Sequence, residues 1–143
     1  MPILIEIKDF KTQQYNPGNP LENTLCEMIK NYKGNCAIMS FNPYVLKWFR
    51  LHAPDVIRGQ LSQFFKEEKL GPIVKFALKR MMLNRTVSKP HFIAYLHSDL
   101  PNRFVKKFKK LPLLAWPVPS QQEYMRIAPY CDNIIFENFE PKI

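Results

Sequence analysis

Two charged residues near the N-terminus have the types and spacing that could do chemistry. Glu6 and Lys8 stand two residues apart at the end of an apolar run that begins at Ile3. Side chains on a strand alternate between its faces, so Glu6 and Lys8 share one face while Ile5 and Ile7 share the other. On a surface antiparallel sheet that charged face would meet water. In a parallel barrel it would point into the lumen near the carboxyl end of a strand, where such folds place their chemistry. Alternation alone leaves both alternatives open.

Short apolar segments recur along the chain and predict the strands that would position this pair. Each has the length of a strand and is rich in β-branched or aromatic residues. The predicted strands are Ile3–Ile7, Cys36–Phe41, Val56–Leu61, His91–Leu96, Leu113–Val118 and Asn133–Glu137.

Five helical patterns separate these strands, and most open with a start signal that uses an N-cap residue, a proline in the first turn or a capping box. The predicted starts are Asn19-Pro20, Asn42-Pro43, Gly71-Pro72 and the capping pair Ser120 and Glu123. Four of the patterns have an apolar stripe that we expect to face inward. The stripes are Leu21, Leu25, Met28, Ile29 and Tyr32; Val45, Leu46 and Phe49; Ile73, Phe76, Ala77 and Met81; and Phe104, Val105, Phe108 and Leu111.

Alternation of six strands with helices predicts an α/β fold with a parallel sheet. The near-continuous apolar character of the strands suits a sheet covered on both faces. No linker, repeat or low-complexity tract divides the chain, so we predict one domain over residues 1–143, with a basic helical insertion at about 64–90.

Composition excludes several classes of protein. The 143 residues are 46% hydrophobic, which suits a globular core, and no apolar run is long enough to span a membrane. The N-terminus lacks the pattern of a signal peptide. The three cysteines show no Cys-x-x-Cys spacing and predict reduced thiols in a cytoplasmic protein, with a peripheral membrane location as a further option.

A net charge of +9 favours anionic partners. Nucleic acid is not expected, because no motif that reads DNA or RNA is present and the basic residues are scattered. The insertion at about 64–90 interleaves basic with apolar residues. It could lie on an anionic membrane surface, or it could be a helix that covers a barrel and has a solvated outer face.

Three segments together resemble the later part of a glycerophosphodiester phosphodiesterase domain. They are ILIEIK, AIMSFNPYVLKWFRLHAPDVIRGQL and LLAWPVPSQQEYMRIAPYCDNIIFENFEP. The resemblance implies a TIM-type barrel that hydrolyses glycerophosphodiesters to glycerol phosphate and an alcohol, in lipid metabolism, with a divalent cation.

The resemblance also implies roles for four residues. Glu6 matches the metal-binding glutamate of a Glu-x-Lys motif and would bind Mg²⁺ or Ca²⁺, hard cations that prefer carboxylate oxygens. Lys8 matches the catalytic partner lysine, which would hold a phosphate oxygen. Trp116 would wall the glycerol pocket and Phe41 would line it, with packing in the core as the alternative for each.

The chain departs from the family's pattern in ways that bear on activity. Trp-Thr-Val-Asn is replaced by residues 116–119, Trp-Pro-Val-Pro, and Asp-Gly by Asp132-Asn133. The family's His-Arg-Gly, Glu-x-Asp and His-Asp segments do not occur. None of His52, His91 and His97 replaces them, so all three are expected to be structural.

Six strands are fewer than the eight of a TIM barrel, so the fold class we predict is an incomplete barrel. We expect the chain to enter the barrel partway round, with Ile3–Ile7 at an exposed edge. Such a chain would self-associate or need a companion fragment that bears the missing strands. The predicted function is that of a phosphodiesterase fragment, inactive alone. The alternative is a non-catalytic remnant, or a basic module that binds anionic membrane surfaces.

Overall fold

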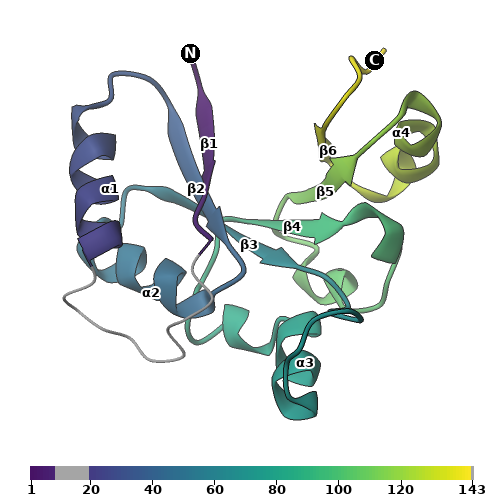
Figure 1. The fold of residues 1–143 in the computed structure, drawn as a ribbon, viewed down its shortest axis with the longest axis horizontal. Helices are drawn as coiled ribbons and strands as arrows, with labels where there is room; N and C mark the ends of the chain where they lie inside the picture. Colours follow the sequence, from purple (N-terminus) through teal and green to yellow (C-terminus); the bar gives the residue numbers. More distant parts are fainter. Residues whose placement is uncertain (9–19, 143) are drawn as a thin grey trace. The chain divides into compact units, whose positions relative to one another are not determined.

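The computed structural model describes residues 1–8 and 20–142, which form strands and helices in alternation (Figure 1). The strands are β1 (Ile3–Glu6), β2 (Cys36–Ser40), β3 (Ile57–Ser62), β4 (Phe92–Leu96), β5 (Leu113–Val118) and β6 (Asn133–Phe136). The α-helices are α1 (Pro20–Asn31), α2 (Pro43–His52), α3 (Pro72–Lys79) and α4 (Gln121–Ile127). Four 3₁₀ turns join them: η1 (Met82–Asn84), η2 (His97–Asp99), η3 (Val105–Phe108) and η4 (Ala128–Tyr130).

The α/β class and all six predicted strands are confirmed, with ends that differ by at most one residue. The chain divides into two compact units. Unit 1 comprises Met1–Leu61 and Leu83–His91, and unit 2 comprises Ser62–Met82 and Phe92–Ile143.

Unit 1 contains three parallel strands in chain order. Glu6 of β1 pairs with Met39 of β2, and Met39 pairs with Gly59 of β3. Helices α1 and α2 supply most of the core on one face of these strands. The buried members of this core are Ile7, Cys26, Ile38, Val45, Leu46, Trp48, Phe49 and Ala53.

Helix α2 begins as predicted. Asn42 accepts a hydrogen bond from the Tyr44 amide at 2.9 Å, and Pro43 occupies the first turn. The expected inward residues of this helix are all buried.

The predicted inward stripe of helix α1 is confirmed in part. Leu25 and Ile29 pack against the core of unit 1, whereas Leu21, Met28 and Tyr32 are exposed. The fully buried residues of the helix are Glu22 and Cys26. The predicted start at Asn19 lies outside the described residues. Burial of an acidic residue in the first turn suits the positive end of the helix dipole, which the apolar pattern could not reveal.

Unit 2 also contains three parallel strands in chain order, β4, β5 and β6. The register of β5 against β6 shifts between Ala115 and Val118. Pro117 lies in this interval and has no N–H to donate, which explains the irregular ladder. The buried core of the unit is Met81, Ile93, Tyr95, Leu100, Phe104, Ala115, Val118 and Ile127.

Two predictions for helices in unit 2 are wrong. No residue of α3 is buried, so the stripe of Ile73, Phe76 and Ala77 does not face inward, and only Met81 beyond the helix reaches the core. The pattern from Phe104 to Leu111 forms only the 3₁₀ turn η3, although its apolar residues do pack on the core. Lys106, Lys107, Lys109 and Lys110 crowd this short segment with like charges, which disfavours a longer helix.

Helix α4 follows the predicted capping residue. The Ser120 hydroxyl accepts from the Glu123 amide at 3.2 Å, and the helix ends before Pro129. Across residues 1–8 and 20–142, no helix has the length and apolar character needed to cross a membrane.

Candidate functional site

Glu6 and Lys8 lie together at the carboxyl end of β1. The Glu6 Oε2 and Lys8 Nζ atoms are 3.9 Å apart, and the side chains are 29% and 72% exposed. The Ile7 amide between them donates to the Met39 carbonyl at 2.8 Å, which continues the β1–β2 ladder past the end of β1. The pair is therefore a solvated carboxylate and ammonium on an ordered backbone.

Two buried polar side chains hold the strand ends beneath this pair. The Ser40 hydroxyl donates to the Ile7 carbonyl at 2.8 Å and accepts from the Asn42 amide at 3.1 Å. The Gln60 Nε2 donates to the carbonyls of Ser40, Phe41 and Leu61, each at 3.1 Å. This Ser40–Gln60 clamp ties the carboxyl ends of β1, β2 and β3 together.

Sequence analysis did not identify the clamp. The only signal for it is a polar residue within each of two apolar strands.

The register places Glu6 on the face of the sheet opposite the helices. Ile5 and Ile7 pack on the core of unit 1 with Ile38, and the alternate positions of β1 and β2 point the other way. Met39 therefore shares a face with Glu6. In a parallel barrel this is the side of the lumen. Phe41 directly follows β2 and is partly buried.

Trp116 has a corresponding place in unit 2. It pairs with Leu96, while the neighbouring pair of Tyr95 and Ala115 belongs to the core. Trp116 is partly buried and is not a member of that core. The tryptophan thus lies on the face of its sheet that points away from the main core.

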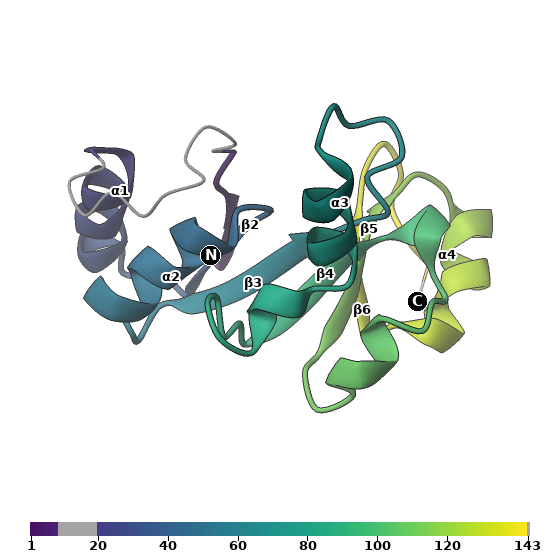
Figure 2. The same cartoon turned by 90° about the horizontal axis from the view of Figure 1, so that it is seen from below.

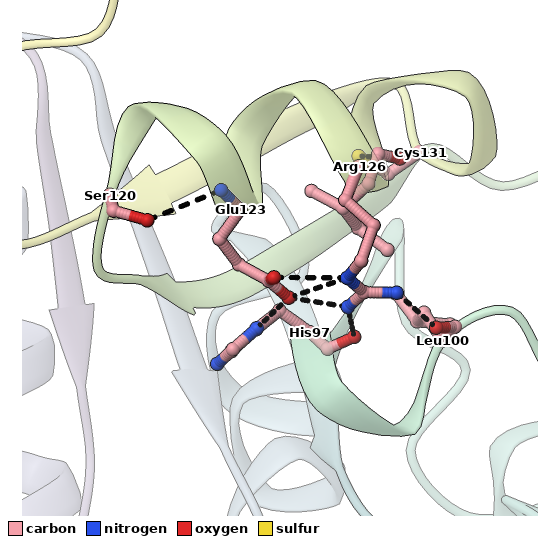
Figure 3. A network of polar contacts seen from close by, with 7 residues as sticks. His97, Leu100, Ser120, Glu123, Arg126 and Cys131 are labelled. Atoms are coloured by element: carbon pink, nitrogen blue, oxygen red, sulfur yellow. Dashed lines mark hydrogen bonds and ion pairs between the residues drawn. The ribbon is translucent and has the colours of Figure 1, made fainter.

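A polar network joins the exit of β4 to α4 in unit 2 (Figure 3). The His97 Nδ1 lies 2.6 Å from Glu123 Oε1. Arg126 donates through Nε to both carboxylate oxygens of Glu123 at 2.9 Å, and its guanidinium also donates to the carbonyls of His97 and Leu100 at 3.0 and 3.2 Å. The bond from Arg126, followed by the bond from His97, lowers the pKa of Glu123 to about 2.

Sequence analysis recognised Glu123 only as a capping residue, and its contact with His97, 26 residues away, has no local signal.

The other two histidines make backbone contacts in unit 1. His91 accepts through Nδ1 from the Arg58 amide at 3.1 Å and donates its own amide to the Arg58 carbonyl at 2.7 Å. Burial, with Arg58 as a smaller cause, lowers the pKa of His91. His52 stacks on Trp48 with ring centroids 4.4 Å apart.

The residues present do not by themselves fit a divalent cation. In the part of the chain that the structure describes, no group of three or more His, Cys, Asp or Glu side chains could hold a metal ion. Glu6 is a single carboxylate with an ammonium beside it, whereas Mg²⁺ and Ca²⁺ require about six oxygen ligands. Any metal chemistry at Glu6 would need ligands from another polypeptide segment.

Comparison with known proteins gives matches in structure only. No protein-family model matches the sequence, and no curated protein matches it. A protein from Silicibacter pomeroyi assigned as a glycerophosphoryl diester phosphodiesterase is 17% identical and covers 93% of this chain, with a TM-score of 0.67.

The glycerophosphodiester phosphodiesterase of Thermotoga maritima is 18% identical over 93% of this chain, with a TM-score of 0.61. A phosphodiesterase from Oleispira antarctica, solved with the product sn-glycerol-3-phosphate, is 13% identical over 80%, with a TM-score of 0.60.

These matches confirm that the fold is part of a TIM-type barrel. The chain spans about half the length of the matched proteins, 45%, 52% and 44% respectively. The structural likeness that the sequence segments predict therefore extends over most of this chain and over a partial domain of its counterparts.

Proposed function

We propose that this chain is the later half of a glycerophosphodiester phosphodiesterase barrel. The observation that supports the proposal best is the coincidence of two features. The fold matches half of such an enzyme over 93% of this chain, and Glu6 and Lys8 lie at the carboxyl end of β1, opposite the face that the helices cover. In (β/α) barrels, active sites are built at the carboxyl ends of the strands.

In this proposal Lys8 is the catalytic residue of the chain. Its ammonium binds a non-bridging phosphate oxygen and offsets negative charge as the phosphodiester is cleaved. Glu6 orients Lys8 at a distance of 3.9 Å and contributes one carboxylate to the metal site that the family uses. Trp116 and Phe41 provide aromatic surface for the glycerol part of the substrate.

The remaining groups come from the strands that these 143 residues do not include, either in the same polypeptide or on a companion fragment. Among the described residues there are neither the other metal ligands nor an acid–base histidine at the end of β1. Loss of general acid–base catalysis typically costs about 10²–10⁴-fold in rate. A fragment with the missing strands would supply both, and would pair with β1, which among the described residues pairs only with β2. The chain alone is inactive in this proposal.

Reconstitution with the missing half tests the function. The full chain is mixed with the half of the Thermotoga maritima barrel that it does not match, and hydrolysis of glycerophosphocholine is followed in Mg²⁺ or Ca²⁺. We expect activity from the mixture and none from either part. Lys8→Met and Glu6→Ala should each reduce the restored activity about 100-fold, whereas Glu27→Ala on the exposed side of α1 should not.

Activity that is unchanged by Lys8→Met would overturn the role of the lysine. A mixture that forms a stable complex without hydrolysing the substrate would overturn the enzymatic proposal.

We also propose a cytoplasmic location. All three cysteines are free thiols, and burial raises the pKa of Cys36 and of Cys131. Raised pKa values keep these thiols protonated and unreactive, which suits a reducing compartment.

A further inference from the structure

Helix α3 exposes the apolar side chains that the sequence pattern would place in a core. Ile73 is 82% exposed and Phe76 is 45% exposed, and Met82 just beyond the helix is exposed as well. Ile73 and Phe76 are three residues apart and lie on the same side of the helix. In Figure 1, α3 lies at the lower edge, beyond the strands of its unit, and in Figures 1 and 2 strands separate it from α4.

The C-terminal end of α3 is fixed to the core of unit 2. The Ser62 hydroxyl donates to the Leu78 carbonyl and the buried Tyr95 hydroxyl donates to the Lys79 carbonyl, each at 3.0 Å. Met81, which follows the helix, is 3% exposed and belongs to the core. The helix is therefore anchored at its C-terminus while its apolar face stays open.

Basic residues lie close to this open face in the sequence and at its border. The segment from 66 to 82 contains five basic residues (Lys66, Lys69, Lys75, Lys79 and Arg80) against two acidic ones, Glu67 and Glu68. The Arg80 guanidinium lies over the Phe76 ring, 4.2 Å from its centroid, which sets a positive charge at the border of the apolar residues. Lys66 is partly engaged, since its Nζ lies 3.7 Å from Asp99.

We propose that α3 docks unit 2 onto the surface of an anionic phospholipid bilayer. Ile73 and Phe76 enter the boundary between headgroups and acyl chains, and Lys75 and Lys79, which follow the Phe76 side of the helix, bind the phosphate groups. The positive charge around the apolar residues favours this occupant, because it complements an anionic lipid surface and would repel a second copy of the same basic patch. The proposal uses neither Glu6 nor Lys8, so it is independent of the phosphodiesterase function.

Vesicle sedimentation with the full chain tests the proposal. Vesicles of phosphatidylcholine alone are compared with vesicles that also contain phosphatidylglycerol, over a range of NaCl concentrations. We expect binding to the anionic vesicles only, weakening as salt is raised. The double variant Lys75→Gln/Lys79→Gln should weaken binding about 25-fold, since each basic residue near an anionic surface contributes roughly fivefold. Ile73→Ser/Phe76→Ser should abolish stable binding.

Matched variants separate the local surface from the overall charge. Lys106→Gln/Lys107→Gln removes the same charge from η3, and Met125→Ser removes an exposed apolar side chain, 70% exposed, from α4. Both should bind as the unchanged chain does. Thermal unfolding of every variant checks that the fold is retained.

Three outcomes would overturn the proposal. The first is an equal loss of vesicle binding in the η3 variant, which would assign the effect to net charge. The second is no binding of the unchanged chain to anionic vesicles. The third is a dimer, seen in sedimentation velocity, that Ile73→Ser/Phe76→Ser dissociates while vesicle binding persists.

Discussion

Glu123 is the residue whose ionisation contributes most clearly to stability. Its carboxylate accepts from Arg126 and from His97, and these bonds lower its pKa to about 2 from an ordinary value of 4.5. A carboxylate whose pKa is lower in the folded state stabilises the fold above its unfolded pKa. That stabilisation is lost as the pH falls from about 4.5 towards 2.

The variant Glu123→Gln should therefore lose about 1–2 kcal/mol of unfolding free energy at pH 7, a figure reduced for partial solvation of the pair. Urea unfolding at pH 7, 5, 4 and 3 measures the difference from the unchanged chain, which should shrink below pH 4.5. Glu140→Gln, at an exposed position, serves as the control. A difference in unfolding free energy that stays constant down to pH 3 would contradict a stabilising role for the ionised Glu123 carboxylate.

His91 should make stability fall in the mildly acidic range. Its Nδ1 must be unprotonated to accept from the Arg58 amide, and burial lowers its pKa below 6.5. Below pH 6.5 the unfolded chain binds a proton that the folded chain resists, so folding weakens as pH falls through the folded pKa. His91→Asn retains an acceptor and cannot titrate. The unfolding free energy of this variant should depend less on pH between 7 and 5 than that of the unchanged chain. An equal dependence on pH would refute the role of His91.

At the scale of secondary-structure elements, the Ser40–Gln60 clamp links the strand ends in unit 1. Gln60 is buried, and its amide satisfies three carbonyls that would otherwise lack this donor. A buried carbonyl without a partner costs about 1–3 kcal/mol.

We expect Gln60→Leu to destabilise the protein by about 2–4 kcal/mol, because several acceptors lose the same donor at once. Chemical unfolding followed by tryptophan fluorescence measures the loss. The exposed Gln122→Leu is the matched change and should cost less than about 0.5 kcal/mol. Equal losses of unfolding free energy in the two variants would show that the clamp does not stabilise the strand ends.

The strands could be predicted from sequence because β-branched and aromatic runs mark them directly, and the helix starts at Asn42 and Ser120 follow from capping chemistry. The apolar pattern of α1 predicted the packing of Leu25 and Ile29, but it could not predict the burial of Glu22, an acidic residue. The open face of α3 could not be predicted either, because an amphipathic stripe is the same whether it meets a core or stays exposed. Alternation and resemblance predict Glu6 and Lys8 as site residues, and the structure places the two side chains together. The Glu123 network depends on contacts distant in sequence.

At the scale of the whole molecule, β1 and β6 each pair on one side only among the described residues. Leu4 on β1 and Phe136 on β6 are 39% and 49% exposed. Unpaired strand edges with exposed apolar side chains are templates for further pairing.

The chain should therefore self-associate as its concentration rises, which sedimentation velocity would detect. Leu4→Lys should shift the association to higher concentration, while Met28→Lys on exposed α1 should not. Addition of the missing half of the barrel should suppress association by occupying β1. A chain that stays monomeric at every concentration would contradict this expectation.

The hydroxyl groups of Ser62 and Tyr95, which donate to carbonyls at the C-terminus of α3, have an electrostatic consequence. Four carbonyls at the C-terminus of any helix lack intrahelical partners and carry its negative pole. Ser62 and Tyr95 donate to two of those in α3, so neutral groups from the protein interior already compensate that pole. The ammonium groups of the helix are not required there as counter-ions, and their positive field extends outward into the solvent.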